Sequence, residues 1–160
     1  MNREFADLSA REVLALAISI EHRNADCYRD WSMRFKTYDL EISNLLNDLA
    51  GEEASHESYL TDYYRNRYDD DPFDVGPALV RAGQEIPSIP DDHYFVESSA
   101  TARAILEAVM SVEVRAHQFY ENIIAACNDP ELSELYHVLL SFEADHVTLM
   151  EKRLSRMALS

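Results

Sequence analysis

The sequence predicts an all-α fold, a four-helix bundle built from two antiparallel hairpins that a long crossover connection joins. Glycine and proline are scarce, at three and five of 160 residues, and most of them fall in one segment. Outside that segment, apolar residues recur at steps of three and four, the pattern of helices that bury one face. Hydrophobic residues make up 47% of the chain and charged residues 28%, so we expect a single domain over residues 1–160.

The first hairpin is expected to consist of helices over about residues 9–35 and 38–65. Ser9 and Glu12 have the spacing of a capping box, which marks the start of the first helix. The second range holds no proline and a single glycine, Gly51. Because the gap between the two ranges is short, the helices should run antiparallel.

Residues 66–98 have the composition of a connector rather than of a helix. They hold four of the five prolines, two of the three glycines and an aspartate run at 69–71. One short helical turn is expected around Ala78–Arg81. Fully extended, such a segment spans up to about 100 Å, so it can cross the whole bundle and start the third helix at the opposite end.

The second hairpin is expected over about residues 99–127 and 130–157. Between its helices, Asn128-Asp129-Pro130 predicts a tight corner, with Asp129 as the N-cap and Pro130 as the first helical residue. The two hairpins together complete the predicted four-helix bundle.

Charge and composition exclude several classes of partner. The formal net charge of −16 argues against nucleic acid and anionic membranes as partners. No apolar run approaches the roughly 18 residues that a membrane-spanning helix needs, and the first residues do not resemble a signal region. Cys27 and Cys127 lack the spacing of a zinc site or a disulfide framework. A cytoplasmic location is therefore expected.

Each of the four helical stripes carries a glutamate near its middle. These residues are Glu21, Glu53, Glu113 and Glu143. A histidine follows three residues later in the second and fourth stripes, as His56 and His146, and a tyrosine follows seven residues later in the first and third, as Tyr28 and Tyr120. The glutamates are 32 residues apart in the first half and 30 in the second, so all four should lie at a similar depth.

Four carboxylates at one level of an apolar core must be neutralised by protonation, by basic side chains or by cations. Removing even one unpaired carboxylate from water costs on the order of several kcal/mol. The stripes offer no lysine or arginine at that level, whereas two divalent cations balance four carboxylates and two imidazoles complete their coordination. This ligand set is the carboxylate-bridged di-iron or di-manganese arrangement, and its oxygen and nitrogen donors also admit zinc. A single Glu-x-x-His motif is weak, because both residues are common on helix surfaces, but the repeated set is specific.

At these residues the sequence resembles the ferritin-like superfamily, and within it the rubrerythrin branch. The motifs are E-E-A-S-H at 52–56 and F-E-A-D-H at 142–146, together with the glutamate and tyrosine of the first and third helices. The resemblance implies that Glu53 and Glu143 bridge two irons, with Glu21 and Glu113 as terminal ligands. His56 and His146 would each bind one iron.

Two features depart from the rubrerythrin pattern. Many rubrerythrins carry another glutamate three residues after the third-helix ligand, where this chain has Ala116. His117 follows it, either as a further metal ligand or, by the simpler interpretation, as a histidine packed beside the site. There is also no rubredoxin-like cysteine site, so the expected redox cycle needs an external electron donor.

The predicted function is that of a di-iron oxidoreductase, which reduces hydrogen peroxide or O₂ or oxidises Fe(II). Tyr28 and Tyr120 are the candidate catalytic residues, because they could hydrogen-bond a ligand carboxylate or intercept a radical; buried, paired tyrosines are the alternative. Two other functions stay open: ferritin-type iron storage or delivery, and a metal-free helical interaction module. The resemblance suggests a homodimer, and the connector could exchange hairpins between chains.

Overall fold

The computed structural model describes residues 7–89 and 93–158 and confirms the all-α prediction. Its helices are α1 (Ala10–Phe35), α2 (Leu40–Tyr68), α3 (Pro77–Gly83), α4 (Ser99–Ala125) and α5 (Pro130–Ala158). No strand occurs in these described ranges. The short α3 lies where the sequence predicts a helical turn, and the four long helices are the predicted ones.

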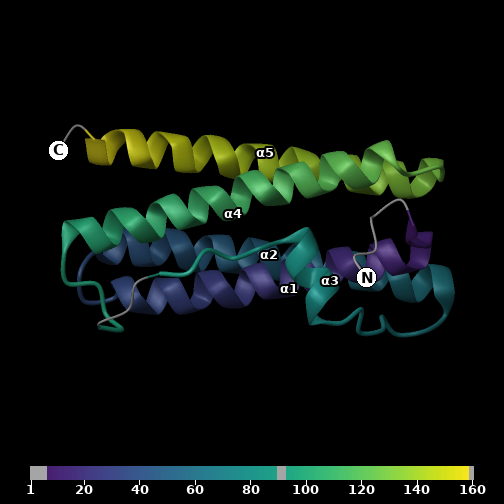
Figure 1. Cartoon of the computed structure of the whole chain (residues 1–160), viewed down its shortest axis with the longest axis horizontal. Helices are drawn as coiled ribbons and strands as arrows, with labels where there is room; N and C mark the ends of the chain where they lie inside the picture. The colour runs from purple at the N-terminus through teal and green to yellow at the C-terminus, as the bar shows by residue number, and fades with distance from the viewer. Residues whose placement is uncertain (1–6, 90–92, 159–160) are drawn as a thin grey trace.

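The four long helices lie side by side as two antiparallel hairpins, α1 with α2 and α4 with α5 (Figure 1). From the end of α2, the connector returns along the bundle, so α4 begins at the end where α2 begins (Figure 1). This is the predicted crossover connection.

Side-chain caps fix where the helices begin. Ser9 and Glu12 form the predicted capping box at the start of α1. Asp39 accepts a hydrogen bond from the Ile42 backbone N–H, which places the start of α2 at Leu40, two residues later than expected. The Asp129 carboxylate caps α5 by accepting from the backbone of residues 131 and 132.

Two helix ends differ slightly from the prediction. Helix α2 continues to Tyr68 and stops because Asp69 takes the left-handed conformation, with φ 48°. Helix α4 ends at Ala125, before the residues that form the corner to α5. Both differences are within the last helical turn and leave the helix register unchanged.

The core consists of two apolar clusters along the bundle axis with a polar level between them. One cluster takes residues 14–20, 60–64, 119–123 and 132–139 from the four helices, and the other takes residues 28–35, 42–50, 102–112 and 150. The four glutamates fall in the gaps between these ranges. Among the described residues, no helix is long and apolar enough to cross a membrane.

The connector covers the side of the bundle formed by α1 and α4. A Cβ atom at Gly83 would lie 2.7 Å from the Ile20 side chain, so α3 approaches α1 very closely. Gln84 is buried and donates to the Val112 carbonyl of α4 at 2.9 Å, while Arg23 of α1 donates to the Gln84 carbonyl at 2.9 Å. These contacts close one face of the bundle next to the polar level.

Candidate metal centre

The structure brings the six predicted site residues together at the middle of the bundle. They are Glu21 of α1, Glu53 and His56 of α2, Glu113 of α4, and Glu143 and His146 of α5. All six are buried, and no glutamate among them exposes more than 1% of its surface. The helical register explains this convergence, because each residue occupies a core position of its own helix.

The six residues form two overlapping groups of four. One group is Glu21, Glu53, His56 and Glu143, and the other is Glu53, Glu113, Glu143 and His146. Within each group, one ligand atom per residue lies within 4.8 Å of every other. Because Glu53 and Glu143 belong to both groups, their carboxylates lie between two possible cation positions. Each group could therefore hold one metal ion.

Both histidines present Nδ1 to the carboxylates. His146 Nδ1 lies 3.2 Å from Glu53 Oε1 and 3.3 Å from Glu113 Oε2. His56 Nδ1 lies 3.6 Å from Glu21 Oε2 and 3.8 Å from Glu53 Oε2. Ligand atoms bound at about 2.1 Å from a shared ion are roughly 3 Å apart, so these spacings suit a small divalent cation.

The two buried tyrosines hold the terminal glutamates from the opposite hairpin. Tyr28 of α1 donates to Glu113 Oε1 at 2.9 Å, and Tyr120 of α4 donates to Glu21 Oε1 at 2.5 Å. Both interpretations left open by the sequence fit these contacts, because each tyrosine is buried with its hydroxyl paired and its partner is a glutamate of the cluster. Burial, with the negative charge of the nearby glutamates, raises the pKa of both tyrosines, so each hydroxyl stays a donor. Each terminal glutamate keeps its second oxygen for the centre.

The atoms that face the centre have no hydrogen-bond partner. They are Oε2 of Glu21 and Glu113, both carboxylate oxygens of Glu53 and Glu143, and Nδ1 of His56 and His146. A buried, unsatisfied acceptor costs about 1–3 kcal/mol, and more when it is charged. A purely structural polar network would satisfy these atoms internally. Their arrangement fits a pair of cations, which would accept all of these lone pairs at once.

Without a cation, the cluster must hold protons. Burial, together with the charge of Glu53, raises the pKa of Glu21 and Glu143 well above the usual range. Burial would raise the pKa of Glu53 too, but the adjacent Glu21, His146 and His56 hold it below the usual range. Burial would lower the pKa of His56, but Glu21 and Glu53 raise it to about 9, and the carboxylates around His146 raise its pKa as well. Binding of a cation would therefore displace protons.

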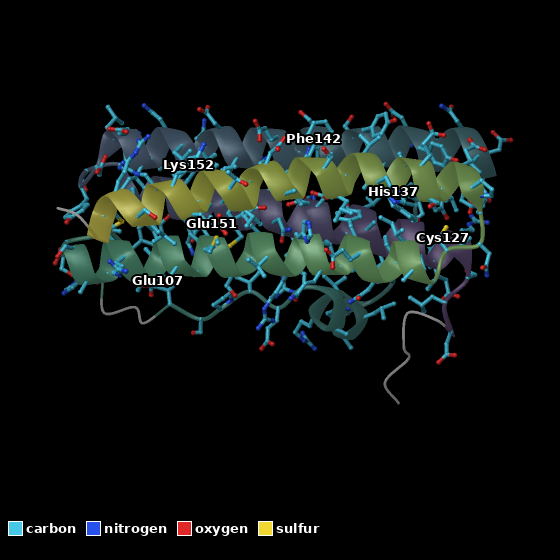
Figure 2. The ribbon with its side chains drawn as sticks, turned by 90° about the horizontal axis from the view of Figure 1, so that it is seen from above. Glu107, Cys127, His137, Phe142, Glu151 and Lys152 are labelled. Carbon is cyan, nitrogen blue, oxygen red and sulfur yellow. The ribbon has the colours of Figure 1, made fainter. Side chains whose placement is uncertain are left out.

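Two residues beside the histidines were not singled out from the sequence. Glu52 Oε2 lies 2.5 Å from Nε2 of His146, and the Phe142 ring stacks on His56 with centroids 5.0 Å apart. Phe142 lies on the side of α5 that faces α2 (Figure 2). Their position directly before Glu53 and Glu143 in the two repeated motifs was the available signal.

A hollow of about 610 Å³ opens over the histidines between α2 and α5. Its lining comprises Glu52, Ser55, His56, Phe142, Asp145, His146 and Leu149. The histidine side chains are 10% and 7% exposed here, whereas the glutamates are sealed. The hollow is thus the side from which a small molecule can approach the centre.

The remaining histidines lie away from the cluster. His117 Nδ1 pairs with Glu121 at 3.1 Å on the outer side of α4, and the adjacent Ala116 is the buried residue. His117 therefore does not replace the glutamate that many rubrerythrins have at the position of Ala116. His22, His93 and His137 are exposed.

Comparison with known proteins agrees with this geometry. A sequence model of the Rubrerythrin family matches residues 12–154, almost the whole chain. The chain belongs to the rubrerythrin family. No curated protein matches it significantly.

Two solved structures share the fold of this rubrerythrin-family chain. One is a hypothetical protein from Pyrococcus furiosus, with a TM-score of 0.76 and 20% identity over 96% of this chain and 92% of its own. The other is an uncharacterized conserved protein from Magnetospirillum magnetotacticum MS-1, also with a TM-score of 0.76 and 20% identity, over 93% and 95% of the two chains. At this identity the likeness concerns the fold alone.

Proposed function

We propose that the chain is a di-iron oxidoreductase of rubrerythrin type, which reduces hydrogen peroxide or O₂, or oxidises Fe(II), with an external electron donor. One observation carries this proposal: two overlapping groups of buried ligands share Glu53 and Glu143, and their inward-facing atoms have no hydrogen-bond partner. Membership of the rubrerythrin family supports iron as the metal.

The residues divide into roles by their position. Glu53 and Glu143 would bridge two ions, Glu21 and His56 would complete one position, and Glu113 and His146 the other. Oxygen and nitrogen donors without thiolate suit iron or manganese and also admit zinc. A ferrous pair, when bound, supplies the two electrons that reduction of a peroxide O–O bond requires.

The protein's own residues position the ligands, exclude water from them and leave a route by which an oxidant can approach. Tyr28 and Tyr120 fix the terminal carboxylates, and the two apolar clusters exclude water above and below them. The hollow beside Phe142 admits a small oxidant to the histidine side of the centre. The two cysteines of these 160 residues do not form a rubredoxin-like site, so electrons for a complete cycle would come from an external donor.

The test is stopped-flow oxidation of the anaerobically Fe(II)-loaded protein with H₂O₂ and with O₂ in parallel. We expect ferric absorption to develop with about one H₂O₂ consumed per two Fe(II), by electron balance. Glu151→Gln, on the exposed surface of α5, is the control and should react as the wild type does.

Two results would decide against the proposal. If the ferrous protein reacted with neither oxidant, the oxidoreductase assignment would fail. If it instead took up many irons per chain and eluted as a large hollow assembly, iron storage would replace it.

A further inference from the structure

The residue that precedes each bridging glutamate contacts the histidine of the facing helix. In α2, Glu52 precedes Glu53 and reaches His146 of α5. In α5, Phe142 precedes Glu143 and reaches His56 of α2. The two contacts are equivalent in the repeated halves of the bundle, but one residue is a carboxylate and the other is an aromatic ring.

The two contacts act differently on the histidines. Glu52 Oε2 lies 2.5 Å from Nε2 of His146 and can accept its N–H, which leaves Nδ1 facing the carboxylates, where it would lose its proton to bind a cation. Such a carboxylate fixes the tautomer and orientation of a metal-binding histidine and raises its basicity. The Phe142 ring, 27° from parallel to His56, offers no acceptor. Among the described residues, none accepts a hydrogen bond from His56 Nε2.

The distances inside the centre show the same difference. His146 Nδ1 lies between 3.2 and 3.7 Å from three carboxylates, whereas His56 Nδ1 lies between 3.6 and 3.8 Å from its three. The group around His146 is therefore the more compact.

We propose that Glu52 is a positioning residue that makes the two metal positions unequal. The position formed with Glu113 and His146 binds the first ion more tightly. The position formed with Glu21 and His56, against Phe142, fills second and exchanges its ion more readily. This inference rests on the proposed metal centre but not on any redox reaction there.

Titration with Co²⁺ tests the order of filling without redox chemistry. We expect two binding steps in calorimetry and in the visible spectrum. Replacement of an outer hydrogen-bonding partner costs about 10–100-fold in metal affinity. Because the Glu52 side chain is 58% exposed, we expect about a tenfold loss in the first step for Glu52→Ala, with the second step unchanged. Glu52→Gln, which keeps an acceptor, should recover part of the loss and part of the Co²⁺ spectrum.

Two further variants test whether Glu52 acts through its contact with His146 or only through its negative charge near the centre. Asp145→Ala removes an exposed carboxylate from the same hollow and should leave both steps unchanged. Phe142→Glu gives His56 the partner that His146 already has, and should tighten the second step. In crystals with one Co²⁺ per chain, anomalous scattering should place the ion beside His146.

Each outcome decides the inference. Equal affinities in the wild type would overturn it, as would a first ion beside His56 or an equal effect of Glu52→Ala and Asp145→Ala. If no Co²⁺ binds at all, the proposed centre fails together with the inference. If the ions bind in the expected order but the iron-loaded protein is inert to oxidants, the inference stands and the proposed function fails.

Discussion

The two faces of the bundle beside the metal centre are built differently. On the α1–α4 face, Gly83 and Gln84 of the connector pack against Ile20 and Val112 and seal the centre. On the α2–α5 face no connector crosses among the described residues, and the hollow reaches the two histidines. Phe142 is 46% exposed at its edge. The connector lies along the side of α4 away from α2 (Figure 2).

The two faces therefore have different roles: the closed face shields the metal ligands from water, and the open face gives small molecules access to them. The closed face keeps water from the carboxylates, which is why their pKa values move so far. Of the six site residues, the open face exposes only the edges of the two histidines, so solutes meet the histidines before the glutamates. A break in the closed face should therefore reduce stability, whereas a change in the open face should alter exchange.

The largest expected effect is the pH dependence of metal binding, which measures how well the closed face excludes water from the carboxylates. The raised pKa values of Glu21, Glu143 and His56 mean that the metal-free folded chain holds protons that the unfolded chain has lost by pH 8. Its free energy of unfolding should therefore fall as pH rises from 6 to 9. Metal displaces these protons, so affinity should rise about tenfold per pH unit for each proton released.

Calorimetric titration with Mn²⁺ at pH 6, 7 and 8 measures this slope, and thermal melts with and without Mn²⁺ check it independently. The stabilisation by Mn²⁺ should grow with pH. A flat profile would mean that solvent reaches the carboxylates, and the sealed centre would be wrong.

A substitution in the closed face should cost stability. Gly83→Val places a branched side chain where even a Cβ would lie 2.7 Å from Ile20, and overpacking of this kind costs about 1–3 kcal/mol. Gly51→Ala is the matched control, because a Cβ there meets nothing within 4 Å and α2 should gain about 1 kcal/mol. Urea unfolding of the two metal-free variants measures both. If Gly83→Val were as stable as the wild type, the close packing of α3 would be refuted.

A substitution in the open face should change exchange with little effect on folding. Phe142→Ala removes the half-exposed ring over His56, so a chelator should extract bound metal several-fold faster. Val138→Ala, on the same helix and 41% exposed, should leave extraction unchanged. Extraction rates followed with a coloured Fe(II) chelator give the comparison. If the chelator extracted metal equally fast from Phe142→Ala and from the wild type, the hollow beside Phe142 would not be the route to the centre.

Much of this molecule could be predicted from its sequence. The apolar periodicity predicts the four long helices. Caps such as Ser9 and Asp129 are local signals, so the starts of α1 and α5 could be predicted as well. The four glutamates lie together as predicted, because in regular antiparallel hairpins residues at matching spacings from the turn come to the same level of the bundle. Periodicity does not decide between adjacent residues at a helix end: Tyr64 is fully buried and accepts a hydrogen bond from Arg11, while Tyr63 lies at the edge of the core.

Contacts between hairpins could not be predicted. The sequence suggests a carboxylate partner for Tyr28 and Tyr120 but does not show that each reaches across to the other hairpin, because that depends on the crossing of α1 and α4. The roles of Glu52 and Phe142 also depend on the distance between α2 and α5. Helical periodicity places these two residues at the rim of the core and gives no partner for them.

Metal content per chain tests the central claim most directly. After anaerobic loading with Fe(II) and desalting, elemental analysis of the wild type and of Glu151→Gln should give about two irons per chain. Glu53→Ala and Glu143→Ala should each retain less than about one, because each removes a ligand shared by both positions. A wild type without bound iron, or a Glu143→Ala variant that still holds two, would contradict the two-metal centre.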